Sequence, residues 1–279
     1  MLNDIERIWV IGASTGIGKA LVTALAKFDK SIITSARSED KLDALCGQTP
    51  SKCEPQTLDI TNDSACQAVV EKLQSTYPSI DMVVVNAGTC EYIDSDEIDM
   101  SSIKRVMDTN FTAAVSTINA ALPLLRESAK QGKTPKLVVM SSSVTYQALP
   151  RAHVYGASKA ALRYFTECLK IDLQQEGIDV HLVSPGFVKT PLTDLNDFPM
   201  PLLMEPEEAA SRIISGLERG IFDIHFPQRF TRTLKLISLL PDHLRFSLLA
   251  KLSRNASQAD SSTRTTQSIA TTNPQDHQQ

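Results

Sequence analysis

Short apolar runs alternate with longer amphipathic stretches over most of the 279 residues, and this alternation restricts the chain to few folds. Runs of buried-strand length that alternate with helical patterns are typical of βαβ units wound into a parallel sheet. We therefore expect an α/β fold with one doubly wound parallel sheet between two layers of helices. Ligands of such sheets bind in the crevice at the carboxyl ends of the strands.

The expected elements can be assigned from their patterns. The strands are predicted at 8–11, 32–35, 56–59, 82–85, 137–140 and 180–183, where apolar residues run together. The helices are predicted at 19–28, 62–75, 103–126, 157–174 and 206–219, the last opening with Pro206 in its first turn.

The sequence divides into three parts. Residues 1–227 carry the strand and helix alternation and form one expected domain, in which the Pro- and Thr-rich segment 186–205 is predicted to be a long loop or lid. Residues 228–252 form a basic, apolar extension that we expect to be an amphipathic helical segment. Residues 253–279 are rich in Ser, Thr, Gln and Asn, and we expect a disordered tail because they offer little to bury. Three interpretations of 229–251 stay open: a helical cap over the substrate cleft, a contact between subunits, or a peripheral membrane contact.

Composition excludes several classes of protein. The net charge is −4 without a strongly basic half, so we expect no nucleic-acid partner. The five cysteines lack a CxxC pair and any zinc-type spacing with histidines, so we expect no metal site and reduced thiols in a cytoplasmic protein. The first residues show no signal-peptide pattern, and no apolar run reaches the length of roughly 18 residues that spans a bilayer.

A glycine-rich turn follows the first predicted strand and opens a helix. It comprises Gly12, Ser14, Thr15, Gly16, Ile17 and Gly18. Glycines allow the backbone to approach a pyrophosphate, and the helix N-terminus supplies free N–H groups with a partial positive charge. This turn therefore predicts a phosphate-binding site.

A tyrosine and a lysine stand four residues apart at Tyr155 and Lys159, thirteen residues after Ser142. Positions i and i+4 share a helix face, so a ligand there meets both side chains. We expect the ammonium to lower the pKa of the phenol, which would favour proton transfer near neutral pH.

The ordered set of motifs resembles the short-chain dehydrogenase/reductase family. The matches are the Gly12 to Gly18 spacing, Asp59, the triplet Asn86, Ala87 and Gly88, Asn110, Ser142, the Tyr155/Lys159 pair, Pro185 with Gly186, and Thr190. Together they cover roughly residues 6 to 226. The resemblance implies a Rossmann-like sheet and an oxidoreductase.

The resemblance also implies roles for the matching residues. Tyr155 would be the proton donor or acceptor, Lys159 would support it and bind the nicotinamide ribose, and Ser142 would hold the substrate oxygen. Asn110 would support a proton path, although an amide that caps a helix or fills a helix kink is the alternative. Further cofactor contacts are implied at Asp59, Ile60, Asn86, Ala87, Gly88, Pro185, Gly186, Val188 and Thr190.

Cofactor choice depends on the end of the second strand. Dinucleotide folds that prefer NAD place an acidic side chain there, whereas an arginine accommodates a 2′-phosphate. Ala36 is neutral and Arg37 follows it, so we expect NADP(H) to be favoured over NAD(H).

The sequence predicts an NADP(H)-dependent carbonyl reductase or alcohol dehydrogenase for a hydrophobic small molecule. The alternative is a dinucleotide-binding sensor or scaffold without turnover. The family commonly assembles through its long helices, so we expect a homo-oligomer. Two residues depart from the family pattern: Ile11 replaces a usual Thr and Val85 a usual Asn. We interpret them as a compatible apolar pair.

Overall fold

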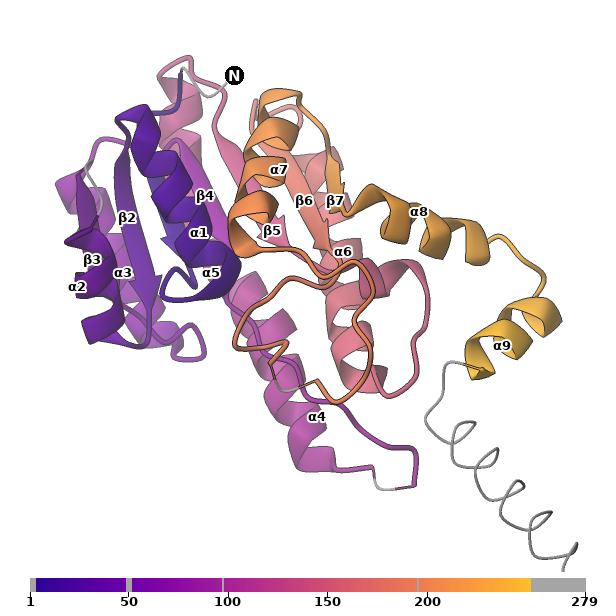
Figure 1. Ribbon diagram of the computed structural model, residues 1–279. Coiled ribbons are helices and arrows are strands. Elements are labelled where there is room, and N and C mark those ends of the chain that lie inside the picture. The colour runs from indigo at the N-terminus through magenta and orange to yellow at the C-terminus, as the bar shows by residue number, and fades with distance from the viewer. Residues whose placement is uncertain (1–3, 49–51, 97, 195, 252–279) are drawn as a thin grey trace, which may run out of the picture.

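A seven-stranded parallel sheet forms the centre of the molecule (Figure 1). The computed structural model describes residues 4–48, 52–96, 98–194 and 196–251. Its strands are β1 (Arg7–Ile11), β2 (Ser31–Ala36), β3 (Cys53–Thr57), β4 (Met82–Val85), β5 (Lys136–Met140), β6 (Asp179–Pro185) and β7 (Asp223–Phe226), in the spatial order 3-2-1-4-5-6-7. The predicted doubly wound, Rossmann-like sheet is confirmed.

Two layers of helices cover the sheet (Figure 1). Helices α1 (Gly16–Leu25), α2 (Glu39–Cys46) and α7 (Pro206–Glu218) share one apolar core, and α3 (Asp63–Thr76), α5 (Ala113–Lys130) and α6 (His153–Asp172) share the other. Side chains alternate between the two faces of a strand, so Ile8 and Val10 enter the first core whereas Trp9 and Ile11 enter the second.

Shorter elements link these layers and extend them. They are the 3₁₀ helices η2 (Ala26–Phe28) and η4 (Ser143–Tyr146), helix α4 (Met100–Met107), the π-helix η3 (Asp108–Thr112), α8 (Gln228–Ile237) and α9 (Asp242–Ala250). Helices α8 and α9 occupy the predicted extension, whereas the predicted tail at 253–279 lies outside the described residues.

Several boundaries differ from the prediction. The helix predicted at 103–126 is α4, η3 and α5 in succession, because the π-helix interrupts the α-helical repeat. The third strand is Cys53–Thr57 rather than 56–59: it pairs only with β2 at the sheet edge, where Pro55 is tolerated. The sequence prediction missed α2, which has mixed polarity, and the short edge strand β7.

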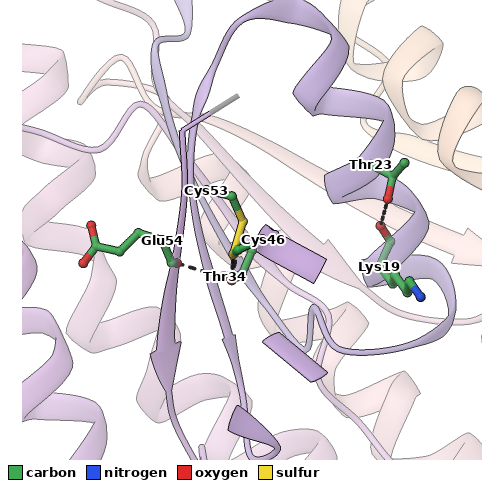
Figure 2. Close-up of a disulfide and its surroundings, with 6 residues drawn as sticks. All are labelled: Lys19, Thr23, Thr34, Cys46, Cys53 and Glu54. Carbon is green, nitrogen blue, oxygen red and sulfur yellow. Dashed lines mark hydrogen bonds between the residues drawn. A yellow bond between two sulfur atoms is a disulfide. The ribbon is translucent and has the colours of Figure 1, made fainter. Parts of the chain in front are cut away.

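The cysteine prediction is wrong for two of the five residues. Cys46, at the end of α2, and Cys53, at the start of β3, form a disulfide (Figure 2). The Thr34 hydroxyl of β2 lies 3.5 Å from the Cys46 sulfur and donates a hydrogen bond of 3.3 Å to the Glu54 carbonyl oxygen. The two sulfurs meet because α2 ends near the edge of the sheet, where β3 begins beside β2. Cys66, Cys90 and Cys168 are free thiols, as expected.

Candidate active site

The glycine-rich turn connects β1 to α1 at the carboxyl end of the sheet. Gly12 and Gly16 have φ angles of 83° and 54°, which favour glycine. A Cβ atom at Gly18 would lie 2.1 Å from the Gly12 carbonyl oxygen, so that position also requires glycine. Thr15 is the N-cap of α1, and its side chain makes no capping hydrogen bond. The first N–H groups of the helix therefore stay available to an anion.

The loop after β4 packs directly against this turn. Asn86 Nδ2 donates a 2.7 Å hydrogen bond to the Gly12 carbonyl oxygen, and a Cβ atom at Gly12 would lie 2.6 Å from the Ala87 nitrogen. β1 and β4 are sheet neighbours although their helices cover opposite faces, and this reversal of strand order opens the crevice. The predicted triplet Asn86, Ala87 and Gly88 thus borders the same crevice as the glycine turn.

The predicted catalytic residues come together beside that crevice. Ser142 caps η4 and its hydroxyl accepts a 3.2 Å hydrogen bond from the Val144 nitrogen. Ser142 lies near Tyr155 in the first turn of α6 and acts to lower the pKa of that phenol. A serine hydroxyl next to a phenol can bind a substrate oxygen and keep it within reach of the phenolic proton.

Lys159 is buried one helical turn after Tyr155. Its ammonium donates a 2.9 Å hydrogen bond to the Met140 carbonyl oxygen, and a Cβ atom at Gly88 would lie 3.3 Å from Nζ. Burial lowers the pKa of Lys159 to about 8, while the Cys90 thiol acts in the opposite direction. The lysine amine therefore faces the loop after β4.

The pKa of Tyr155 moves opposite to our expectation. Burial raises it to about 12, Cys90 adds to the rise, and the hydrogen bond with Ser142 opposes it. Lys159 is not among the causes of this shift, and its ammonium donates to the Met140 carbonyl oxygen. The protein's own groups hold Tyr155 as a protonated phenol at neutral pH.

Asn110 braces the site from behind. It is fully buried in the π-helix η3, where its Nδ2 donates to the Thr89 carbonyl oxygen at 2.8 Å and to the Ser158 hydroxyl at 3.0 Å. Its Oδ1 accepts a 2.7 Å hydrogen bond from the Thr89 nitrogen. The amide thus ties the loop after β4 to α6.

The segment after β6 closes the other side of the crevice. Pro185 ends β6, Gly186 follows, and Val188 is buried and pairs with Met204 in a short parallel bridge. Thr190 lies over the glycine turn, since a Cβ atom at Gly16 would lie 2.8 Å from its Cγ2. The predicted contacts after β6 therefore meet the turn after β1.

Comparisons with known proteins agree with this geometry. The family model of the short chain dehydrogenases matches residues 6–197. The chain belongs to the short-chain dehydrogenase/reductase family. It is therefore an oxidoreductase of the class that acts on CH–OH and C=O groups.

The proteins that are similar to this chain differ from one another in length and in their described activity. An uncharacterized oxidoreductase of Myxococcus xanthus is 33% identical over 84% of this chain and 92% of its own. The 11-beta-hydroxysteroid dehydrogenase 1A of Arabidopsis thaliana is 34% identical over 67% of this chain, which spans 53% of that longer protein. Among solved structures, the Pseudomonas aeruginosa RhlG/NADP active-site complex has a TM-score of 0.73 and 25% identity, with 81% of this chain and 96% of that chain covered.

The region beyond β2 and the glycine turn carries more basic residues than the sequence prediction named. Arg37 follows β2 and is exposed. Hydrogen bonds from Thr61 lower the pKa of Asp59 most, and the charge of Arg37 lowers it further. A nearby pocket of about 370 Å³ is lined by the glycine turn, Lys19 and Lys41. Lys41 was missed because α2 itself was not predicted. Ile60, the remaining predicted contact, is buried after Asp59.

Cys90 and Tyr92 are further neighbours of the catalytic pair. Burial raises the pKa of the Cys90 thiol to about 11, so the thiol stays protonated and unreactive at neutral pH. The Tyr92 ring packs edge-on against Phe198 at 5.2 Å between centroids, and Phe198 in turn packs against Phe187 at 6.0 Å. This aromatic row joins the loop after β4 to the segment 186–205. Only the folded chain reveals it, because the three rings are far apart in sequence.

Proposed function

We propose that this chain is an NADP(H)-dependent reductase of hydrophobic ketones or aldehydes, or the corresponding secondary-alcohol dehydrogenase. The observation that carries the proposal is that Ser142 lies beside Tyr155, one helical turn from the buried Lys159. Proton transfer to a substrate oxygen needs an acid and a second donor that holds that oxygen. Tyr155 and Ser142 supply these two groups.

A nicotinamide dinucleotide fits the residues of the crevice. The cradle at Gly12, Gly16 and Gly18 has no room for side chains, and the α1 N-terminus has N–H groups for a pyrophosphate. Gly88 leaves space beside the Lys159 amine for a ribose hydroxyl. The other proposed contacts are Ser14, Thr15, Ile17, Asp59, Ile60, Asn86, Ala87, Pro185, Gly186, Val188 and Thr190.

The mechanism that we propose assigns one step to each catalytic side chain. A bound nicotinamide dinucleotide supplies the hydride for carbonyl reduction. Ser142 holds the carbonyl oxygen, and Tyr155 gives its proton to that oxygen as negative charge develops. Lys159 in its ammonium form stabilises the phenolate that remains, and Asn110 holds the loop after β4 against α6. The raised pKa of Tyr155, about 12, supports the reductive direction because the phenol starts protonated.

Preference for NADP(H) is the finer part of the proposal. Arg37, Lys19 and Lys41 bring three positive charges to the region beyond β2 and the glycine turn, where a 2′-phosphate would lie. No carboxylate occupies position 36 or 37, the end of β2 at which an acid would bind the ribose of NAD. The matching charge supports NADP(H) over NAD(H).

Two measurements test the proposal together. Oxidation of NADPH and of NADH should be followed with ketones and aldehydes of increasing chain length, with wild type, Tyr155→Phe and Arg37→Ala. We expect Tyr155→Phe to lose turnover while it keeps NADPH binding, and Arg37→Ala to weaken NADPH roughly tenfold with little effect on NADH. Tight NADPH binding without turnover of any carbonyl would favour the sensor or scaffold instead.

We also propose a homo-oligomer that assembles through α6 and its neighbours. Tyr164 and Ile171 lie on α6, away from the site. They are 73% and 72% exposed, which is unusual for large apolar side chains. The molar mass in solution of wild type and of Ile171→Ser tests this assembly. A monomeric wild type would rule it out.

A further inference from the structure

Helix α8 is fixed to the catalytic domain along one face. Thr231 is buried, and its hydroxyl lies 2.7 Å from His225 Nδ1. Lys235 reaches back to Asp223 at 3.2 Å and lies 4.4 Å from the centroid of the Tyr146 ring. These contacts join α8 to β7 and to η4, the element that follows Ser142. Helix α8 is therefore packed firmly against the rest of the fold.

Helix α9 turns one face toward the domain and leaves another outside. Phe246, Leu249 and Ala250 line a pocket of about 540 Å³ together with residues of η4 and the first turns of α6. Leu244 and Leu248, four residues apart on α9, are 50% and 42% exposed. The inner face thus packs toward the domain, whereas the leucines of the other face stay about half exposed.

The turn between α8 and α9 adds to this outer surface. Leu236 is 66% exposed and Leu239 is 80% exposed, and Leu240 precedes Pro241 in the same turn. Figure 1 shows α8 leading away from the sheet, with this turn at its far end. Apolar side chains gathered on a projecting segment mark a surface that binds something. We call residues 228–251 with these exposed leucines the α8–α9 surface.

The charge of the α8–α9 surface is opposite to that of the rest of the chain. Residues 228–251 hold five basic residues and only one acidic residue, Asp242, whereas the whole chain has a net charge of −4. Arg229 and Arg232 are exposed and form no ion pair with any described residue. Basic side chains beside exposed leucines are the combination that binds an anionic lipid interface.

We propose that the α8–α9 surface docks on an anionic lipid surface. Arg229, Arg232 and Lys251 meet the headgroups, and Leu239 and Leu244 enter the boundary of the acyl region. A second copy of the chain fits less well, because a two-fold contact between identical basic surfaces would bring like charges together. The docking is peripheral, since no helix among the described residues is long and apolar enough to cross a membrane.

Docking at this surface would place the lipid next to the substrate cleft. Phe230, in the first turn of α8, packs against Phe187 at 5.5 Å between centroids. A Cβ atom at Gly186 would lie 3.0 Å from Phe230 Cδ1, so α8 touches the start of the segment 186–205. If the proposed reductase function holds, this arrangement points to carbonyl or alcohol substrates that partition into lipid.

Co-sedimentation with vesicles tests the docking without any need for turnover. The 279-residue chain should bind vesicles of phosphatidylcholine with phosphatidylglycerol and should bind phosphatidylcholine alone far more weakly, with affinity that falls as salt rises. Arg229→Gln/Arg232→Gln should weaken binding by roughly thirtyfold. Leu239→Ser/Leu244→Ser should also weaken it, because the exposed leucines no longer enter the interface.

Matched variants separate docking from general effects. Lys27→Gln/Arg219→Gln removes the same charge from exposed positions outside the surface, and Ile98→Ser removes an exposed apolar side chain before α4; both should bind like wild type. Equal binding to both kinds of vesicle, or equal loss in the control pair, would overturn the proposal. A leucine variant that changes the molar mass without lipid would assign the surface to a second copy. Retained NADPH affinity and melting temperature show that each variant is folded.

Discussion

Ile11 of β1 and Val85 of β4 are register partners at the carboxyl ends of two neighbouring parallel strands. Both side chains are buried in the same apolar core. The two departures from the family pattern are therefore neighbours in space, so the interpretation of a compatible apolar pair has a structural basis.

Val85→Asn should lower the free energy of unfolding by about 1–3 kcal/mol, because it buries an amide opposite an isoleucine with no partner. Ile11→Thr combined with Val85→Asn should restore part of that loss by giving the amide a hydroxyl. Denaturant unfolding of the two single variants and the double variant measures the coupling. Additive losses would show that the two positions do not act as a pair.

The glycine at position 18 gives a prediction about cofactor binding. A Cβ atom there would lie 2.1 Å from the Gly12 carbonyl oxygen, so Gly18→Ala must open the turn. We expect at least a tenfold loss of NADPH affinity, measured by fluorescence titration, because the backbone can no longer approach the pyrophosphate. Gly156→Ala is the matched control, since its Cβ would make an ordinary 3.5 Å contact with Val144. An unaffected Gly18→Ala would contradict the phosphate-binding role.

Local spacing made this part of the site predictable. The glycine turn and the Tyr155/Lys159 pair are each read within a few residues, and the strand–turn–helix order gives their place at the sheet edge. The Cys46–Cys53 disulfide and the ring of Tyr92 were missed because each depends on packing between separate elements. The pKa of Tyr155 was misjudged for the same reason: the burial that raises it depends on how other elements pack around α6. Lys41 was missed because α2 was not predicted.

The pKa of Lys159 predicts how reduction depends on pH. Because burial lowers this pKa to about 8, the ammonium loses its proton as the pH rises through that value. The value of kcat/KM for carbonyl reduction should then fall above about pH 8, since a neutral amine no longer stabilises the phenolate. Tyr155, with a pKa of about 12, stays protonated across this range and cannot cause the fall. Lys159→Arg should remove the fall at pH 8, because arginine keeps its charge. A wild-type profile that stays flat up to pH 10 would contradict the assignment.

The contacts of Asp223 predict a link between α8 and the proposed catalytic residues. Its carboxylate accepts hydrogen bonds from the Tyr146 hydroxyl at 2.8 Å, the Ser184 hydroxyl at 2.8 Å, Arg163 at 3.2 Å and Lys235 at 3.2 Å. Burial opposes its ionisation, but Arg163 and the other donors outweigh burial and lower the pKa of Asp223. Tyr146 belongs to the helix that Ser142 caps, and Arg163 follows Lys159 by one turn of α6.

Asp223→Asn should destabilise the protein by about 1–3 kcal/mol and make α8 more susceptible to limited proteolysis, because two cations lose their counter-charge. Wild type should be more stable than the variant at pH values above the ordinary pKa of an aspartate. This difference in stability should shrink as the pH falls through the lowered pKa of Asp223. Turnover should fall as well, since Tyr146 and Arg163 adjoin the catalytic residues. Asp179→Asn is the control: it breaks ion pairs with Lys136 and Lys170 at the opposite end of β6, so it should cost stability without a matching loss of kcat. If both variants lost kcat equally, the loss in Asp223→Asn would follow from lower stability and not from a link to the site.

The disulfide between Cys46 and Cys53 predicts both a thiol count and a stability change. Because the crosslink closes a loop with a sequence separation of 7, its removal should lower the free energy of unfolding by about 2–3 kcal/mol through the entropy of the unfolded chain. Cys46→Ser and Cys53→Ser should each show this loss, whereas Cys168→Ser, an exposed free thiol, should not. Thiol titration of the denatured protein without reductant should detect Cys66, Cys90 and Cys168 and leave the other two unreactive. If all five cysteines react, the crosslink is absent and the expectation of reduced thiols is restored. Since α2 carries Lys41 at the cofactor crevice and ends at Cys46, NADPH affinity should also fall in the two crosslink variants and stay constant in the control.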